Sequence, residues 1–164
     1  MAHLIGSELP KDLLAKIKSQ TNENSNEVPL LISTDSEGFP NVSLLSYLDI
    51  VALPPDRMVF AIGADSSSKA NLLRTRKGTL LFWAGKNSGV YYVKGKVRQV
   101  KKELTKSAEG FKLSALLMNV EKVSQDHSDE AKLLSTLTYD NKSINYGHLE
   151  LFKELKQFSK SLKR

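Results

Sequence analysis

The spacing of apolar and polar residues along this 164-residue chain predicts a β-rich protein with helices towards both ends. Apolar residues recur at helical spacing over residues 8–20, where Pro10 suits a first turn. Two runs rich in strand-forming residues follow, 28–35 and 39–50, and the polar residues 36–38 between them favour a turn. We therefore expect a β-hairpin directly after the first helix.

The remaining pattern predicts four more strands, a short crossover helix and a helical tail. The strands are expected at residues 57–63, 78–85, 90–100 and 111–123, and the crossover helix at 70–77. The period of two in the fifth strand places one polar set on one face and a mainly apolar set on the other: Tyr92, Lys94, Lys96 and Arg98, opposite Tyr91, Val93, Gly95 and Val97. From about residue 128 the tail is predicted helical, with an apolar stripe that must pack on its own barrel or on a second copy: Leu149, Phe152, Leu155, Phe158 and Leu162.

This order of elements favours an antiparallel barrel over a doubly wound parallel sheet. About six antiparallel strands with flanking helices define a mainly β, α+β fold. We expect a single domain over residues 1–164, with the barrel at about 28–124, the first helix at about 8–20 and the helical tail at about 128–163.

Composition narrows the classes of protein. The chain has no cysteine, which excludes disulfides, thiolate catalysis and cysteine-ligated clusters. No apolar run is long enough to span a bilayer and no signal peptide is recognisable, so we expect a cytoplasmic protein without a membrane partner. The net charge is +6, and part of the excess lies on the fifth strand. A solvated strand face is the favoured interpretation, and a nucleic-acid surface made by Lys94, Lys96 and Arg98 is an alternative.

The sequence offers no self-contained catalytic machinery. His3, His127 and His148 lack metal-ligand spacing, so no metal site is predicted, and no catalytic side chain is identified. If the protein catalyses a reaction, a cofactor is expected to carry the chemistry.

Residues 65–71 are the most informative segment for ligand binding. A strand ends there, three serines follow, and a helix begins. The backbone N–H groups of the first helical turn have no acceptor within the helix, so they can donate to an anion. Ser66, Ser67, Ser68, Lys69 and Asn71 supply donors for an anion such as a phosphate. A serine acting only as a helix N-cap is the alternative interpretation.

With these elements in order, residues 28–123 resemble the pyridoxamine 5′-phosphate oxidase-like family of split-barrel FMN-binding proteins. Five blocks carry the resemblance: PLLISTDSEGFPNVSLLSYLDI, RMVFAIGADSSSKANLLR, TLLFWAG, VYYVKGKV and LSALLMNVEKV. The family's phosphate loop matches the segment that contains Ser67, Ser68 and Lys69, with Ser68 where the oxidases have arginine. The resemblance thus implies a split β-barrel that holds the phosphate of FMN at this loop.

The resemblance also assigns the ring side of the site. The family's second strand offers backbone amides to the isoalloxazine edge, and it matches Val42, Ser43, Leu44 and Leu45. Ser43 is the best side-chain contact on that strand, whereas Val90 replaces the glutamine that the oxidases keep for the ring. The family is typically dimeric, so the resemblance implies a homodimer with flavin at the subunit interface.

The resemblance does not extend to the vitamin B6 substrate. The oxidases end in a stretch with a tryptophan and paired arginines, whereas the only tryptophan here is Trp83 and Arg164 is the sole arginine after Arg98. We expect an FMN-binding protein that is not a B6 oxidase, with a flavin-dependent oxidoreductase of unidentified substrate as the first hypothesis. The alternatives are a non-enzymatic flavin or haem sensor of the same fold and the nucleic-acid-binding protein described above.

Overall fold

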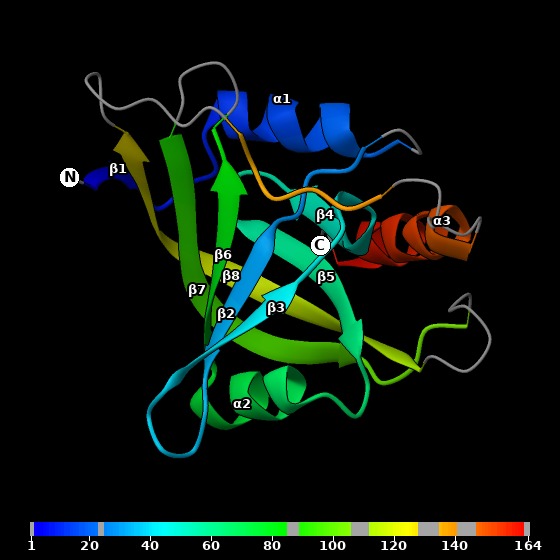
Figure 1. Ribbon diagram of the computed structural model, residues 1–164. Helices are drawn as coiled ribbons and strands as arrows, with labels where there is room; N and C mark the ends of the chain where they lie inside the picture. The colour runs from blue at the N-terminus through cyan, green and yellow to red at the C-terminus, as the bar shows by residue number, and fades with distance from the viewer. Residues whose placement is uncertain are drawn as a thin grey trace.

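The computed structural model describes residues 2–22, 25–84, 89–105, 112–127, 135–140 and 147–162. Within these ranges one antiparallel sheet is flanked by three helices (Figure 1). Its strands are β1 (His3–Gly6), β2 (Leu30–Thr34), β3 (Pro40–Leu44), β4 (Ile50–Leu53), β5 (Arg57–Gly63), β6 (Lys77–Trp83), β7 (Gly89–Lys101) and β8 (Leu113–His127). The helices are α1 (Lys11–Gln20), α2 (Ser67–Thr75) and α3 (Gly147–Ser161), and η1 (Tyr47–Asp49) is a short 3-10 helix.

The strand order is β3-β2-β6-β7-β8-β5-β4, with β1 added beside β8. The long strand β8 joins the two halves, because it pairs with β7 along most of its length and with β5 and β1 on its other edge. Among the described strands, β3 and β4 at the two ends of this order form no ladder with each other. The sheet is therefore curved but open, and the predicted mainly β, α+β split barrel is confirmed.

The predicted hairpin is present, but its second strand is shorter than expected. Asp35 Oδ1 accepts from the N–H groups of Glu37 and Phe39 at 3.0 and 2.8 Å, and Gly38 has φ 94°, a value that glycine tolerates best. The prediction of one strand over residues 39–50 is wrong beyond Leu44. There a reciprocal capping box between Ser46 and Asp49 starts η1.

The described residues form eight strands, whereas the pattern predicts about six. The two additional strands are β4, which follows η1 directly and pairs with β5, and β1, whose exposed residues carry no apolar alternation. Both are short edge strands that acquire their conformation from a neighbouring strand.

Two clusters of buried side chains lie on opposite faces of the sheet. The larger lies inside the barrel and includes Leu13 and Ile17 of α1 together with Tyr47, Phe60 and Phe82. Pro10 is the N-cap of α1, one residue before the first helical turn where it was predicted. Figure 1 shows α1 at the top of the view, α2 at the bottom and α3 at the right.

The second cluster docks the tail on the chain's own barrel. Leu151 and Leu155 of α3 are buried against β4 and β5, and Phe152, Phe158 and Leu162 pack around them. The predicted helical start at about residue 128 is wrong for the described part, residues 135–140. This segment is extended because it pairs with residues 26–28, where Val28 N–H donates to Leu137 O at 2.9 Å and Tyr139 N–H donates to Asn26 O at 3.0 Å.

Strand β7 has the two faces that its sequence predicts. Lys94, Lys96 and Arg98 are exposed, and Tyr91, Val93, Gly95 and Val97 are buried. Gly95 lies at a β-bulge where β8 approaches so closely that an added Cβ would lie 2.2 Å from Asn119 O. This position requires glycine for close backbone approach.

Candidate functional site

The two segments predicted to bind FMN meet in the structure. Ser43 on β3 and Ser68 in the first turn of α2 are hydrogen-bonded through their hydroxyls, in a short contact in which either oxygen is able to donate. Asn41, two residues earlier on the same face of β3, donates from Nδ2 to Ser68 Oγ at 2.7 Å. The hairpin edge and the start of the crossover helix therefore form one polar cluster.

The polar cluster continues inwards to β2 and the second turn of α2. Ser33 Oγ accepts long hydrogen bonds of 3.4 Å from Asn41 Nδ2 and from Asn71 Nδ2. Ser33, Ser68 and Asn71 are all buried, so the hydroxyls and amides are held against one another away from bulk water. No carboxylate belongs to these hydrogen bonds, which makes the cluster rich in donors without a competing negative charge.

The sequence pattern did not identify Ser33 or Asn41 as site residues. Their signal is present in the hairpin: Ser33 pairs with Asn41 in the β2–β3 register, and Asn41 precedes Ser43 by two residues on one strand face. Three polar residues on one face of the hairpin, Ser33, Asn41 and Ser43, indicate that polar groups pack against that face.

The start of α2 is an ordinary capped helix. Ser66 is the N-cap, because its Oγ accepts from Lys69 N–H at 3.2 Å, and this hydroxyl also donates to Gly63 O at 2.8 Å. The N-cap interpretation thus holds for Ser66. Ser67 is exposed, and the Lys69 ammonium donates to Ala64 O at 2.8 Å, so it lies folded back over the turn before the helix.

The remaining predicted residues lie along β3 and just after it. Val42 and Leu44 alternate with Asn41 and Ser43, and their side chains are 54% and 68% exposed on the opposite face. Leu45 is buried, and its N–H donates to Pro29 O at 2.9 Å. Because β3 ends the strand order, its outer edge has no strand partner within the described chain.

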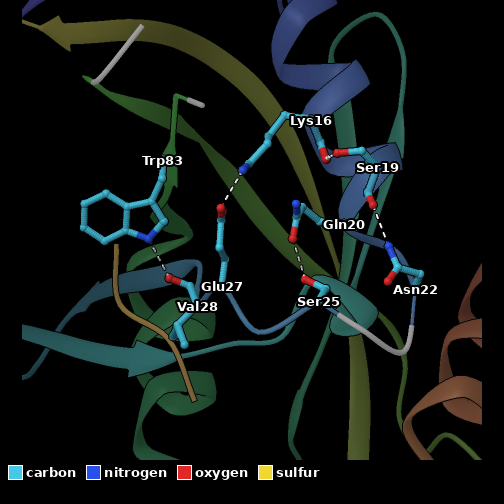
Figure 2. Close-up of polar contacts among 8 residues, drawn as sticks. All are labelled: Lys16, Ser19, Gln20, Asn22, Ser25, Glu27, Val28 and Trp83. Carbon is cyan, nitrogen blue, oxygen red and sulfur yellow. Dashed lines mark hydrogen bonds and ion pairs between the residues drawn. The ribbon is translucent and has the colours of Figure 1, made fainter. Parts of the chain in front are cut away.

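The side chains of Trp83 and Tyr91 have hydrogen-bond partners within the described chain. Trp83 donates from Nε1 to Val28 O at 3.0 Å, as Figure 2 shows, and so anchors the chain before β2. In the same view Lys16 of α1 pairs with Glu27 at 2.7 Å. The Tyr91 hydroxyl bonds the Asp12 carboxylate, and burial together with this carboxylate raises the pKa of Tyr91. The Lys16–Glu27 pair ties α1 to the segment before β2, and the Tyr91–Asp12 bond ties α1 to β7.

Among the described residues there is neither a candidate metal site nor a helix that could span a membrane. No cluster of three or more histidine, cysteine, aspartate or glutamate side chains has the arrangement of a metal site there. None of the helices described has the length and apolar character that crossing a membrane requires.

The fold is shared with solved structures of pyridoxamine 5′-phosphate oxidase-like proteins. A Lactobacillus delbrueckii protein assigned as a pyridoxamine 5′-phosphate oxidase superposes with a TM-score of 0.54 at 17% identity, over 75% of this chain and 98% of that one. A pyridoxamine 5′-phosphate oxidase-related, FMN-binding protein from Nostoc punctiforme gives 0.51 at 8% identity, over 79% and 96%. A tagged HupZ variant from Group A Streptococcus gives 0.53 at 14% identity, over 71% and 98%.

These similarities define the class of fold. The chain has the split-barrel architecture of the pyridoxamine 5′-phosphate oxidase-like proteins, as its sequence resemblance implied. No family model matches the sequence, and no curated protein matches it. The identities are low enough that the likeness concerns the fold alone.

Proposed function

We propose that this protein binds FMN, with the phosphate at the start of α2 and the ring system along β3. The observation that carries this proposal is the direct contact of Ser43 with Ser68, which brings together two segments assigned separately to the two ends of one ligand. The FMN-binding protein of Nostoc punctiforme, which shares the fold, adds support.

The residues at the start of α2 and on β3 carry hydrogen-bond donors that suit a phosphate. Ser67, Ser68 and Asn41 offer hydroxyl and amide donors, and the first-turn N–H groups of α2 add the positive end of the helix. The Lys69 ammonium has one backbone acceptor and carries a mobile positive charge close by. A dianion at this place would replace the Ala64 carbonyl as the partner of Lys69.

The outer edge of β3 fits the ring side of such a ligand. Its backbone groups lack a strand partner in the described chain, and the side chains of Val42 and Leu44 make the exposed face apolar. Bound FMN would supply hydride chemistry at the flavin N5, and the protein would bind and orient it.

We further propose a homodimer that uses this same edge and encloses the flavin at the subunit interface. Phe39, Val42 and Leu44 are 64%, 54% and 68% exposed and follow one another along the hairpin. Exposed apolar side chains gathered on an edge strand mark an interaction surface, because burying them against a second copy is favourable. The function is then that of a flavoprotein, an oxidoreductase of unidentified substrate and not a vitamin B6 oxidase.

Titration of FMN into the purified chain tests the proposal. We expect the flavin fluorescence to be quenched to saturation with one FMN per chain, and riboflavin to bind more weakly because it lacks the phosphate. Turnover of pyridoxamine 5′-phosphate by the FMN-loaded protein would contradict our expectation that the protein is not a B6 oxidase. Fluorescence that stays unquenched at concentrations well above those of the protein would contradict flavin binding itself.

A further inference from the structure

Basic side chains gather on three neighbouring strands of the sheet, β6, β7 and β8 (Figure 1). The strand register places Lys77 of β6 directly opposite Lys96 of β7. It also places Lys94 of β7 directly opposite Lys122 of β8. All four side chains are exposed, and we call them the lysine face. The sequence of β7 alone favours a solvated strand face, and the register adds to it one lysine from each neighbouring strand.

The four lysines point to the outside of the barrel. Side chains directly opposite each other on paired strands lie on the same face of a sheet, and so do residues two apart on one strand. Val93 and Val97, which alternate with the lysines of β7, belong to the cluster inside the barrel. Lys94 and Lys96 are therefore on the outer face, about 7 Å apart along β7, and the exposed Arg98 continues their line.

The lysine face places like charges next to one another. Lysines directly opposite each other on paired strands destabilise a sheet, and this face has two such pairs in adjacent rows, Lys77 with Lys96 and Lys94 with Lys122. An anion that contacts several of these lysines at once relieves their repulsion and releases counterions. The arrangement therefore fits a partner that carries a row of negative charges.

Two acids lie on the same strands and reduce this charge only in part. Glu121, at the bulge of β8, pairs with Lys96 Nζ at 2.9 Å, and because both side chains are exposed the ion pair is weak. Asp126 lies opposite Val90, four residues along β8 from Lys122. The lysine face thus keeps an excess of positive charge.

A partly exposed aromatic side chain indicates which polyanion fits. Tyr92 precedes Lys94 by two residues on the same face of β7. An unpaired base is able to stack on such a ring, whereas the bases of a duplex are stacked on each other. Along the described lengths of β6, β7 and β8 no large apolar side chain is exposed, which disfavours insertion into a lipid surface. These features favour a single-stranded nucleic acid.

We propose that the lysine face binds single-stranded nucleic acid, with backbone phosphates on the four lysines and a base stacked on Tyr92. Phosphates are common to RNA and DNA, so we expect both to bind. In the strand order β7 and β8 are three and four positions away from β3. Binding here does not use the proposed flavin site and is measured on the flavin-free chain, so the two proposals fail or succeed separately.

Fluorescence anisotropy with labelled oligothymidylate and oligouridylate of about 20 nucleotides tests the proposal. We expect saturable binding that weakens as the salt concentration rises from about 50 to about 200 mM. Four phosphate contacts on a single strand, at about −0.7 each, predict a slope of about −3 for the logarithm of the association constant against the logarithm of the salt concentration.

Three results with the native chain would overturn the proposal. The first is that both oligonucleotides stay free at the lowest salt concentration. The second is tighter binding of a duplex of the same length than of either single strand. The third is binding to vesicles of phosphatidylserine and phosphatidylcholine without binding to either oligonucleotide, which would assign the lysine face to a lipid surface.

Two triple variants with the same net charge locate the binding. The first replaces three lysines of the face by glutamine: Lys77→Gln, Lys94→Gln and Lys122→Gln. It should weaken binding at low salt by about tenfold or more and bring the slope close to about −0.7, since one contact remains. The control replaces three exposed lysines of α1 and α3: Lys11→Gln, Lys18→Gln and Lys160→Gln. Equal losses in both would assign binding to the net charge and overturn the proposal.

Two further measurements separate stacking and folding from charge. Tyr92→Leu should weaken binding about fivefold or more and leave the salt slope unchanged, because a base contact and no ionic contact is lost. Unchanged affinity in Tyr92→Leu would contradict the single-strand assignment. The triple variant of the lysine face should have a thermal midpoint no lower than that of the native chain, because it removes like-charge pairs. A lower midpoint would contradict the repulsion on which the proposal rests.

Discussion

The hydroxyls of Ser43 and Ser68 are hydrogen-bonded to each other, and this contact joins an edge strand to the start of the crossover helix. Ser43 belongs to a strand whose outer edge is open, whereas Ser68 lies at a helix N-terminus, where backbone donors gather. The pair therefore places the open edge of β3 directly beside the start of α2.

Removing either hydroxyl should destabilise the protein. Ser68→Ala leaves the Asn41 amide and the Ser43 hydroxyl short of a partner in a mostly buried place, and we expect a loss of about 1–2 kcal/mol in the free energy of unfolding. Ser43→Ala should cost less, because Asn41 keeps its bond to Ser68. Urea denaturation measures both.

The matched control for this pair is Ser67→Ala, because Ser67 is the exposed neighbour of Ser68. We expect it to change stability by less than about 0.5 kcal/mol. The double variant of Ser43 and Ser68 should lose less than the sum of the two single losses, since both remove the same bond. Strict additivity would show that the hydroxyl contact is absent in solution.

Gly95→Ala should disrupt the sheet where β7 meets β8. The added methyl would lie 2.2 Å from Asn119 O and 2.8 Å from Met118 Cγ, so the backbone of β8 has to move. Overpacking of this kind costs about 1–3 kcal/mol or more, seen as a lower thermal midpoint. Lys94→Ala, at the exposed neighbour on the same strand, is the control, and an equal midpoint for both variants would contradict the close approach.

The pH dependence of stability should change in Asp49→Asn. Burial raises the pKa of Asp49 above its ordinary value of 3.8, although the Ser46 N–H and the charge of His148 oppose the rise. The folded chain thus holds this proton to higher pH than the unfolded chain, and the free energy of unfolding falls as pH rises from 3.8 to the raised value. The variant lacks this fall.

Thermal unfolding of the native chain and Asp49→Asn between pH 3.5 and 7 measures the effect. Relative to the native chain, the variant should gain stability steadily as the pH rises through this window. Asp56→Asn, at an exposed turn, should instead follow the native curve. A curve for Asp49→Asn that runs parallel to the native one would place Asp49 in contact with water.

If the protein forms a homodimer through the edge of β3, introducing a charge on this strand should lower the measured molar mass from that of a dimer to that of a monomer. Light scattering after gel filtration should give a dimer for the native chain and a monomer for Val42→Lys, because burying a lysine charge at the proposed interface is unfavourable. Leu4→Lys introduces the same charge at an exposed apolar residue of β1 and should remain dimeric. A native monomer, or a dimeric Val42→Lys, would contradict an interface at this edge.

The sequence pattern correctly predicted the elements whose conformation depends on residues close together in the chain. The alternation in β7, the glycine turn before β3 and the capped start of α2 were all predictable, because each depends on residues adjacent in sequence. The break after Leu44 was missed because a capping box of Ser46 and Asp49 interrupts an otherwise apolar run. The extended conformation of residues 135–140 was missed because it depends on pairing with residues 26–28, far away in the chain.

For the candidate sites too, single residues were assigned from the sequence, whereas contacts between distant segments were not. Ser43 and Ser68 were each assigned through family resemblance, but their contact depends on how the hairpin folds over α2. Asp49, Tyr139 and His148 line one cavity but come from three separate segments, and of these three Asp49 alone belongs to a local motif, its capping box with Ser46. A site built by long-range packing leaves no spacing in the sequence to recognise.

The comparison of FMN with riboflavin in the native chain and in Lys69→Glu tests the proposed flavin site most directly. With dissociation constants taken from fluorescence quenching, the native chain should prefer FMN by about tenfold or more. Lys69→Glu should lose that preference while binding riboflavin unchanged, and Lys11→Glu on the exposed side of α1 should retain it. Equal affinities for the two flavins in the native chain, or equal losses for both in Lys69→Glu, would contradict a phosphate site at the start of α2.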